Sequence, residues 1–315
     1  MLILDKADID KRIKLLRQEL YQRPISDELR GWNYDKPPIQ PFSETIRFGV
    51  GELAARYCET LRDIYLKRVL NVKPPANIKM VTGVALHEVI KNVFFEVKKF
   101  IYNNPEATGL DLLNELIVKN TEIAENSINK SENVICKLDS DKRQELHKKC
   151  VATYNFLVIQ ASAKYDQTLS KYRFAESDSI VNITIPPVAE RKVDGAFIGL
   201  SSELSVDVYT PYNAIIDIKT GEMRKFHPLT AAGYALATEC GENTPMDYGF
   251  IVYLKFDRKT PSFITKYFIV GDELRREFIE IRDEATQIVE EGNDPGMPAK
   301  CPDYCPYYQI CHKGE

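Results

Sequence analysis

The sequence predicts a mixed α/β fold with a helical N-terminal half and a central mixed sheet in the second half. Up to about residue 175, apolar residues recur mainly at helical spacing. From about residue 179, short β-rich runs separated by turn residues alternate with helical segments. Because strands and helices are interleaved there, we expect one elaborated domain over residues 1–315, with helices flanking the sheet.

The first half is expected to consist of an N-terminal helical arm over 1–75 and a helical insertion over 105–175. The elements expected in the arm are a charged helix over 5–20, an irregular proline-containing stretch over 23–45 and a helix over 45–70. Prolines break the chain at 71–77, and a further helix opens at Thr82 and Gly83. The insertion is expected to be helical apart from a loop near 129–140.

The second half is expected to form the core of the fold over 179–292, in the order strand-strand-strand-helix-strand-strand-helix. The strands are expected within 179–200, 202–210, 213–221, 248–256 and 262–270, and the helices within 224–240 and 271–292. A cysteine-rich tail over 295–315 follows.

Composition excludes several classes of protein. The 315 residues are 44% hydrophobic and 28% charged, so the chain can bury a real core and is not disordered. A formal net charge of −4 argues against a generally basic nucleic-acid coat, although a local basic groove stays possible. No apolar run approaches the ~18–20 residues of a membrane helix. The charged N-terminus does not resemble a signal peptide, so we expect a cytoplasmic protein without membrane contact.

Three of the seven cysteines, Cys301, Cys305 and Cys311, lie within eleven residues near the C-terminus. An odd number of cysteines without an export signal argues against a disulfide framework. Closely spaced thiolates favour zinc or an iron–sulfur cluster over magnesium or calcium. A fourth ligand is needed, for which Cys58 and His312 are the candidates. The local spacing does not separate zinc from iron–sulfur.

Asp217 and Lys219 follow a buried-type strand in the run IIDIKTG. Positions i and i+2 of a strand point to the same face, so the two side chains emerge side by side. A metal-binding carboxylate beside a lysine suits phosphodiester hydrolysis. Asp194, which precedes a glycine at another strand end, and His87 on a helix could complete such a site. Taken singly, D-x-K is more often a solvated ion pair and Asp-Gly a turn.

The order of these motifs resembles that of the RecB-type nucleases of the PD-(D/E)xK superfamily, and most closely the iron–sulfur exonucleases associated with CRISPR adaptation. The similarity extends over residues ~55–311 and fits a larger, divergent archaeal-type subgroup. The matching positions are Cys58, His87, Asp194 in D-G, Asp217 and Lys219 in D-x-K, Tyr234, Cys301, Cys305 and Cys311. Thr230 stands at the glutamine position of the Q-x-x-x-Y helix, and the first gap of the cysteine tail is one residue longer than usual.

The resemblance implies a metal-dependent deoxyribonuclease that trims single-stranded DNA ends before CRISPR spacers are inserted. His87, Asp194, Asp217 and the Ile218 carbonyl would hold Mg²⁺ or Mn²⁺. Lys219 would position the attacking water or stabilise developing charge, and Tyr234 would orient the strand.

The resemblance also implies a structural iron–sulfur cluster on Cys58, Cys301, Cys305 and Cys311. A four-iron cluster is favoured over a two-iron cluster, and zinc is an open alternative. The expected partners are DNA and other CRISPR adaptation proteins, and an oligomer is possible.

Two further interpretations stay open. The chain could be a non-catalytic subunit of a CRISPR adaptation complex that keeps the nuclease fold to hold DNA or a partner, an idea that Thr230 supports. It could also be a zinc-stapled structural protein in which the D-x-K pair has no catalytic role.

Overall fold

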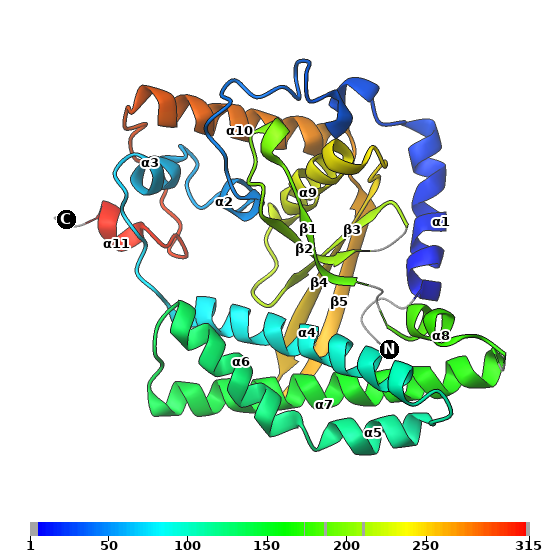
Figure 1. Cartoon of the computed structure of the whole chain (residues 1–315). Helices are drawn as coiled ribbons and strands as arrows, with labels where there is room; N and C mark the ends of the chain where they lie inside the picture. Colours follow the sequence, from blue (N-terminus) through cyan, green and yellow to red (C-terminus); the bar gives the residue numbers. More distant parts are fainter. Residues whose placement is uncertain (1–5, 173, 186–187, 210–211, 313–315) are drawn as a thin grey trace.

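The computed structural model describes residues 6–172, 174–185, 188–209 and 212–312 and is built around a five-stranded mixed sheet (Figure 1). The strands follow one another across the sheet in chain order: β1 (Val188–Val193), β2 (Leu204–Tyr209), β3 (Ala214–Lys219), β4 (Tyr248–Asp257) and β5 (Thr260–Ile269). The pair β3–β4 is parallel and the other pairs are antiparallel. A parallel pair needs a crossover connection, which helix α9 (His227–Glu242) supplies. The expected mixed α/β fold with a helical first half is confirmed.

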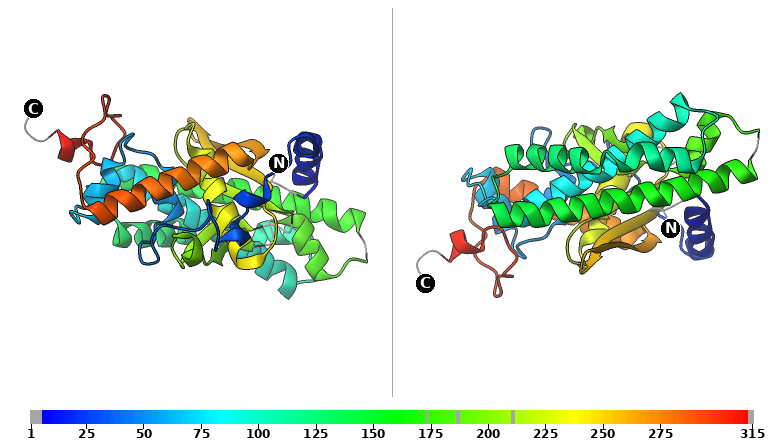
Figure 2. Two further views of the ribbon diagram at one scale, coloured as in Figure 1. Left: turned by 90° about the horizontal axis from the view of Figure 1, so that it is seen from above. Right: turned by 90° about the horizontal axis from the view of Figure 1, so that it is seen from below.

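Helices cover both faces of this sheet (Figures 1 and 2). A layer that includes α4, α6 and α7 packs on one face, and α9 and α10 lie on the other. The helices are α1 (Lys6–Gln22), α2 (Val50–Ala54), α3 (Arg62–Arg68), α4 (Ile78–Asn103), α5 (Gly109–Ile117), α6 (Asn120–Val134), α7 (Ser140–Lys171), α8 (Ser177–Thr184), α9, α10 (Asp272–Glu291) and α11 (Tyr308–Cys311). Within the described ranges, no helix combines the length and apolar character needed to cross a membrane.

Strand β3 shows how the sheet separates two hydrophobic cores. Ile216 and Ile218 belong to the core beneath α4, whereas Ile215 packs in the core beneath α9. A strand covered on both faces reads as a continuous apolar run, which explains the sequence AII before Asp217. The one polar residue in the middle of β3 is therefore placed between two apolar layers.

Three sequence expectations about element boundaries were wrong. The expected helix over 45–70 is interrupted between α2 and α3, where Arg56 and Leu61 adopt left-handed backbone conformations with φ of 38° and 55°. Helix α4 begins at Ile78, before Thr82, because the Asn77 side chain accepts a hydrogen bond from the Met80 amide at 3.0 Å and caps the helix.

The third error concerns the run around residue 180, which was expected to begin the first strand. Residues Ser177–Thr184 instead form α8, and Ile180, Val181 and Thr184 are buried. Such a short apolar run carries no periodicity that separates strand from helix. The burial at i, i+1 and i+4 is helical and packs the run against α4 and α7.

A buried ion pair joins the helices on the α9 side of the sheet. Arg275 of α10 is fully buried and donates to both carboxylate oxygens of Glu239 on α9, at 2.7 and 2.8 Å. Arg30, from the irregular N-terminal arm, donates to the same carboxylate at 2.8 Å. Burial raises the pKa of Glu239, but hydrogen bonding and the charge of Arg275 lower it by more, so this carboxylate stays ionised.

The N-terminal arm lies directly on α9 and α10. A Cβ atom at Gly31 would come within 1.9 Å of the Leu236 carbonyl oxygen, so only glycine permits this approach. Arg282 of α10 is buried and donates to the carbonyl oxygens of Ile39 and Ile198, at 2.6 and 3.2 Å. The arm thus obtains its hydrogen bonds from side chains of the C-terminal half.

Replacing Arg275 by methionine should lower the free energy of unfolding by about 3–5 kcal/mol, because Glu239 would lose its main buried partner. The neighbouring Arg276→Met is the control, since Arg276 and its partner Glu28 are 54% and 61% exposed. Loss of that pair should cost under about 1 kcal/mol. Urea denaturation monitored by circular dichroism measures both. Equal losses in the two variants would contradict the role of the buried pair.

Candidate active site

Two aspartates face each other across β2 and β3. Val208 pairs with Ile216 and Tyr209 with Ile215, so Asp207 lies opposite Asp217 at the next position. There, the Asp207 carboxylate accepts a hydrogen bond from the Ile218 amide at 2.8 Å. A side chain thus takes the place of a main-chain acceptor at the point where the described β2–β3 pairing ends. The two carboxylates are brought together by the register of a hairpin.

Helix α4 brings His87 to the same place. His87 Nδ1 lies 3.7 Å from Asp207 Oδ1. Together with Glu190 and Ile218, these two residues line a cavity of about 20 Å³. That volume is sufficient for one water molecule or an ion of similar size. One imidazole, two carboxylates and the Lys91 amine, which donates to Glu190, line this small cavity together with apolar side chains.

Asp217 is 4% exposed, and its nearest cation is Lys219, whose Nζ lies 2.8 Å from Oδ2. The amine is placed for its hydrogen bond to Oδ1, at 3.2 Å, and among the described residues no donor reaches Oδ2 in hydrogen-bonding geometry. Burial raises the pKa of Asp217 to about 6; the Lys219 charge opposes this rise and the Asp207 charge adds to it. A buried carboxylate that faces a second carboxylate and has a raised pKa is suited to receive a cation.

Helix α9 contributes Tyr234 to the site. Burial raises the pKa of Tyr234, and the charges of Asp207 and Asp217 raise it further, so the phenol stays protonated and close to both carboxylates. Thr230 is buried one turn earlier on the same helix. The structure therefore brings together His87, Asp217, Lys219 and Tyr234, all of which the sequence had singled out.

Asp194 does not join this group. Its Oδ1 accepts a hydrogen bond from the Ala196 amide at 2.8 Å, as in a turn that follows a strand. The β1–β2 register places Glu190 opposite Asp207, so Asp194 lies four residues, or roughly 13 Å, further along β1. Asp207 occupies the place that the sequence analysis gave to Asp194.

Asp207 could have been found from the sequence. It lies between Val206 and Val208 in a strand-like run. Asp207 and Asp217 are also equidistant from Tyr212, the centre of the intervening turn, which predicts that they face each other in a hairpin.

A cluster of basic side chains, which the sequence analysis missed, surrounds His227 beside Lys219. Burial lowers the pKa of His227 to about 4, and the charges of Lys219, Arg224 and Lys255 lower it further. Its Nδ1 lies 3.0 Å from the Tyr253 hydroxyl. The imidazole is therefore neutral at physiological pH and lies among cations, an environment that favours an anionic ligand.

The cysteine tail packs against α3 and the segment before it. Thr60 donates to the Gly296 carbonyl at 2.7 Å, and Arg62 forms a two-pronged ion pair with Asp294. The tail also contacts the loop after β3, since the Arg224 guanidinium lies 3.9 Å from the centre of the Tyr304 ring. The C-terminal segment is thus held between α3 and the loop that follows Lys219.

This packing brings the four predicted cysteine ligands near one another. Burial raises the pKa of Cys305 to about 11, and the neighbouring Cys58 and Cys311 contribute to the rise. Cys311 in turn interacts electrostatically with Cys301 and Cys58. Cys58 and Cys301 are 243 positions apart in the sequence, yet both are close enough to Cys311 to raise its pKa.

Neither the carboxylate site nor the set of four cysteines has its side chains arranged around a metal ion. Across the described ranges, no three His, Cys, Asp or Glu side chains are arranged so that they could hold one. The chemistry of the donors nevertheless fits: imidazole and carboxylates suit Mg²⁺ or Mn²⁺, and four thiols suit zinc or iron–sulfur. The burial of Asp217 opposite a second carboxylate, with one ammonium group beside it, is the observation that favours a cation at the first site.

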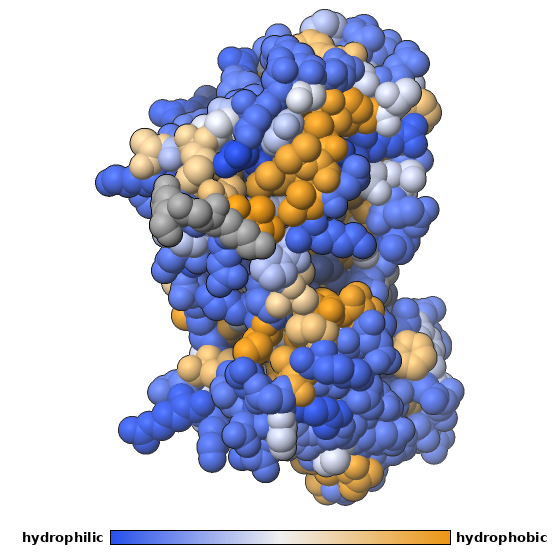
Figure 3. Space-filling view, turned by 90° about the vertical axis from the view of Figure 1, so that its left-hand side faces the viewer, coloured by the Kyte–Doolittle hydropathy of each residue, from blue (hydrophilic) through white to orange (hydrophobic). Residues whose placement is uncertain are grey.

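Exposed apolar side chains lie beside the loop that follows Lys219. Ile78, Met80 and Val84, in the first turns of α4, are 39–43% exposed. These turns adjoin the loop after β3, because a Cβ atom at Gly83 would lie 3.4 Å from Thr220 Oγ1. Figure 3 shows hydrophobic surface on both sides of the hollow between the half of the molecule that contains α3 and the half that contains α4.

The whole chain is similar to one family of proteins. The family model described as CRISPR-associated exonuclease Csa1 matches residues 3–314. A Saccharolobus solfataricus protein named CRISPR-associated exonuclease Csa1 is 30% identical over 309 residues, which cover 98% of each chain. A Thermoproteus tenax protein of the same name is 28% identical over 303 residues, covering 94% of this chain and 96% of its own.

Asp217→Asn should make the metal-free fold more stable at pH 7 by roughly 2–3 kcal/mol, because it removes a buried charge whose pKa is raised by about two units. The native state holds its proton up to about pH 6, whereas the unfolded state loses it near pH 4. The stability of the parent protein should therefore fall as pH rises through this window, and the gain from Asp217→Asn should vanish below about pH 4.

Chemical denaturation in EDTA across pH 4–8 measures this difference, with Asp194→Asn as the control because Asp194 is exposed. A parent protein whose stability rises through this window relative to Asp217→Asn would contradict the assignment.

Proposed function

Because the chain belongs to the family of CRISPR-associated exonuclease Csa1, we propose that it is a metal-dependent DNA exonuclease that trims single-stranded ends before CRISPR adaptation. The observation that carries this proposal is the convergence of His87, Asp207, Asp217 and Lys219 from α4, β2 and β3. The basic group around His227 and the apolar turns of α4 support a nucleic-acid strand as the ligand.

In this proposal, His87, Asp207, Asp217 and the Ile218 carbonyl hold Mg²⁺ or Mn²⁺. The bound cation would lower the pKa of a water molecule and neutralise charge on the scissile phosphate. Asp207 replaces Asp194 in this set because its carboxylate lies opposite Asp217.

The other roles in the proposed reaction belong to side chains of the protein that do not bind the metal ion. Lys219 Nζ, 2.8 Å from Asp217 Oδ2, is close enough to donate to the attacking water or to a phosphate oxygen. The protonated Tyr234 hydroxyl is available to donate to the strand. Arg224 and Lys255, the cations near the neutral His227, add favourable potential for the phosphate that follows.

Digestion of end-labelled single-stranded DNA with Mn²⁺ tests the assignment. Asp207→Asn and Asp217→Asn should each reduce cleavage at least roughly 100-fold, as expected when a group that stabilises the reacting charge is removed. The matched control is Asp194→Asn, which should cleave like the parent protein.

Loss of cleavage in Asp194→Asn but not in Asp207→Asn would contradict the proposed site. A folded protein that binds DNA but cleaves none would favour the non-catalytic subunit.

We also propose that Cys58, Cys301, Cys305 and Cys311 hold a structural iron–sulfur cluster, of the four-iron type. The support is the proximity of the four thiols, together with the contacts that dock the tail against α3. A cluster there would join the N-terminal arm to the end of the chain. Closing so long a loop is expected to stabilise the fold.

Protein purified without oxygen should be brown and contain iron and acid-labile sulfide in equal amounts. Cys305→Ser should lose at least half of the iron and lower the melting temperature, because one of four ligands is missing. Cys136→Ser, in the loop between α6 and α7, is the control and should retain both. A colourless parent protein that contains one zinc ion would refute the iron–sulfur proposal.

A further inference from the structure

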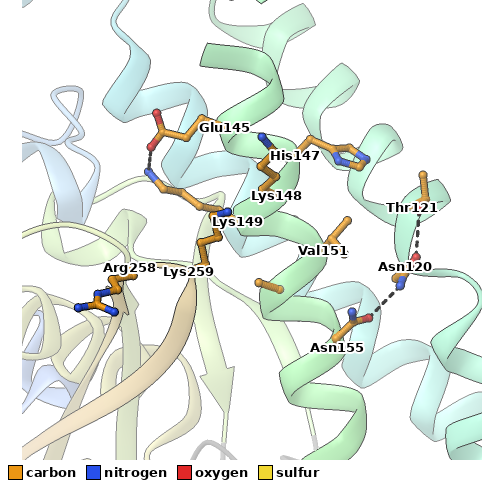
Figure 4. Close-up of a pocket in the computed structure, with 11 residues that line it drawn as sticks. Asn120, Thr121, Glu145, His147, Lys148, Lys149, Val151, Asn155, Arg258 and Lys259 are labelled. Atoms are coloured by element: carbon orange, nitrogen blue, oxygen red, sulfur yellow. Dashed lines mark hydrogen bonds and ion pairs between the residues drawn. The ribbon is translucent and has the colours of Figure 1, made fainter. Parts of the chain in front are cut away.

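A second cavity, of about 520 Å³, lies between α6, α7 and the tip of the β4–β5 hairpin (Figure 4). Its lining residues include none of those that line the carboxylate cavity. Its volume is within the range of small-ligand sites, about 300–1,000 Å³. The proposed mechanism makes no use of it.

The walls of this cavity are basic. Lys148 and Lys149 come from α7, and Arg258 and Lys259 from the hairpin tip. Lys149 is paired with Glu145 at 2.6 Å, but in the described part of the chain the other three cations have no acidic partner within ion-pair distance. In a protein with a net charge of −4, three unpaired cations around one cavity form a local site for an anion.

The interior of the cavity differs from its rim. Val151 and Ala152 supply apolar surface, and the Asn120 amide donates to Asn155 Oδ1 at 3.0 Å. Figure 4 shows Lys259 reaching from the hairpin toward α7, while Asn155 lies deeper along that helix. An apolar and amide-lined interior below a cationic rim matches the two parts of a nucleotide, a flat base and a phosphate.

The hairpin tip has a backbone conformation that its sequence does not favour. Arg258 has φ of 54°, in the left-handed region that Gly, Asn and Asp occupy in tight hairpin turns. An arginine there strains the backbone while adding a cation to the cavity. Strain of this kind is typical of functional positions.

The β3–β4 register relates the cavity to the carboxylate site. Lys219 pairs with Tyr253, and Arg258 lies five residues further along the chain from Tyr253. Five residues of strand span about 17 Å. A strand that keeps the ~3.4 Å rise of a duplex strand needs roughly five nucleotides to span this length, and an extended single strand needs fewer. One strand could therefore reach both places.

We propose that this cavity binds one nucleotide of the DNA strand whose end lies at the carboxylate site. The inference rests on the proposed nuclease function and adds a second point of attachment for its substrate. Strands too short to bridge the two places would bind only at the carboxylate site. The cavity would thereby favour long strands over short ones.

Binding of labelled thymidine strands of 20 and 2 nucleotides, measured by fluorescence anisotropy in EDTA, tests this proposal. Lys148→Glu with Lys259→Glu should weaken binding of the 20-mer several-fold and leave the 2-mer unchanged. The slope of log affinity against log salt should fall by about 0.7 for each lost phosphate contact. The control, Lys11→Glu with Lys14→Glu on α1, makes the same change in net charge.

Equal 20-mer binding by the cavity variant and the control would overturn the proposal. Arg258→Gly provides a second variant, which should weaken 20-mer binding without lowering the melting temperature. A lowered melting temperature with unchanged binding would mean that Arg258 is structural, against the proposal.

Cleavage of the 20-mer with Mn²⁺ separates this inference from the proposed function. A parent protein that does not cleave the 20-mer would remove the basis of both. A parent protein that cleaves it, with a cavity variant that binds the 20-mer like the control, would remove only the second binding point.

Discussion

The buried carboxylate of Glu239 is the constraint on which the arrangement of the sheet's α9 side depends. Two arginines, Arg275 from α10 and Arg30 from the N-terminal arm, converge on it, so three segments distant in sequence share one charge. Because an ion cannot stay buried without such partners, the segments must dock together or not at all. Helix α9 is thereby fixed against the sheet, and with it the position of Tyr234. The turn of α9 that carries Tyr234 is held by the polar contacts of Glu239 later on the same helix.

Asp217 is as deeply buried as Glu239 but has the opposite electrostatic character. Glu239 is surrounded by donors and its pKa is lowered, whereas Asp217 has one lysine, a second carboxylate opposite and a raised pKa. The first arrangement satisfies the charge within the protein. The second leaves it incompletely compensated, which is how a fold holds a place for a cation from solution. The contrast distinguishes a structural carboxylate from a functional one.

Local periodicity was sufficient to predict much of the site and of the sheet. Asp217 and Lys219 could be paired because residues i and i+2 of a strand share a face, and this needs no knowledge of the rest of the chain. Asp194 was named and Asp207 was not considered, because strand register depends on turn geometry, which a motif such as D-G does not encode. The strand expected near residue 180 failed for a related reason. Its β-branched residues pack as a helix on α4 and α7, and that tertiary contact overrides local propensity.

The docking of the N-terminal arm has a consequence for the order in which the protein folds during synthesis. The arm's carbonyl groups at Leu29 and Ile39 are bonded by Arg275 and Arg282, which lie 246 and 243 residues later. The N-terminal arm is therefore synthesised first, but it lacks its final hydrogen-bond partners until nearly nine-tenths of the chain has been made. Helices α4 to α7, which contact one another over short sequence separations, can assemble in the meantime. The arm is thus the first part translated and among the last to find its place.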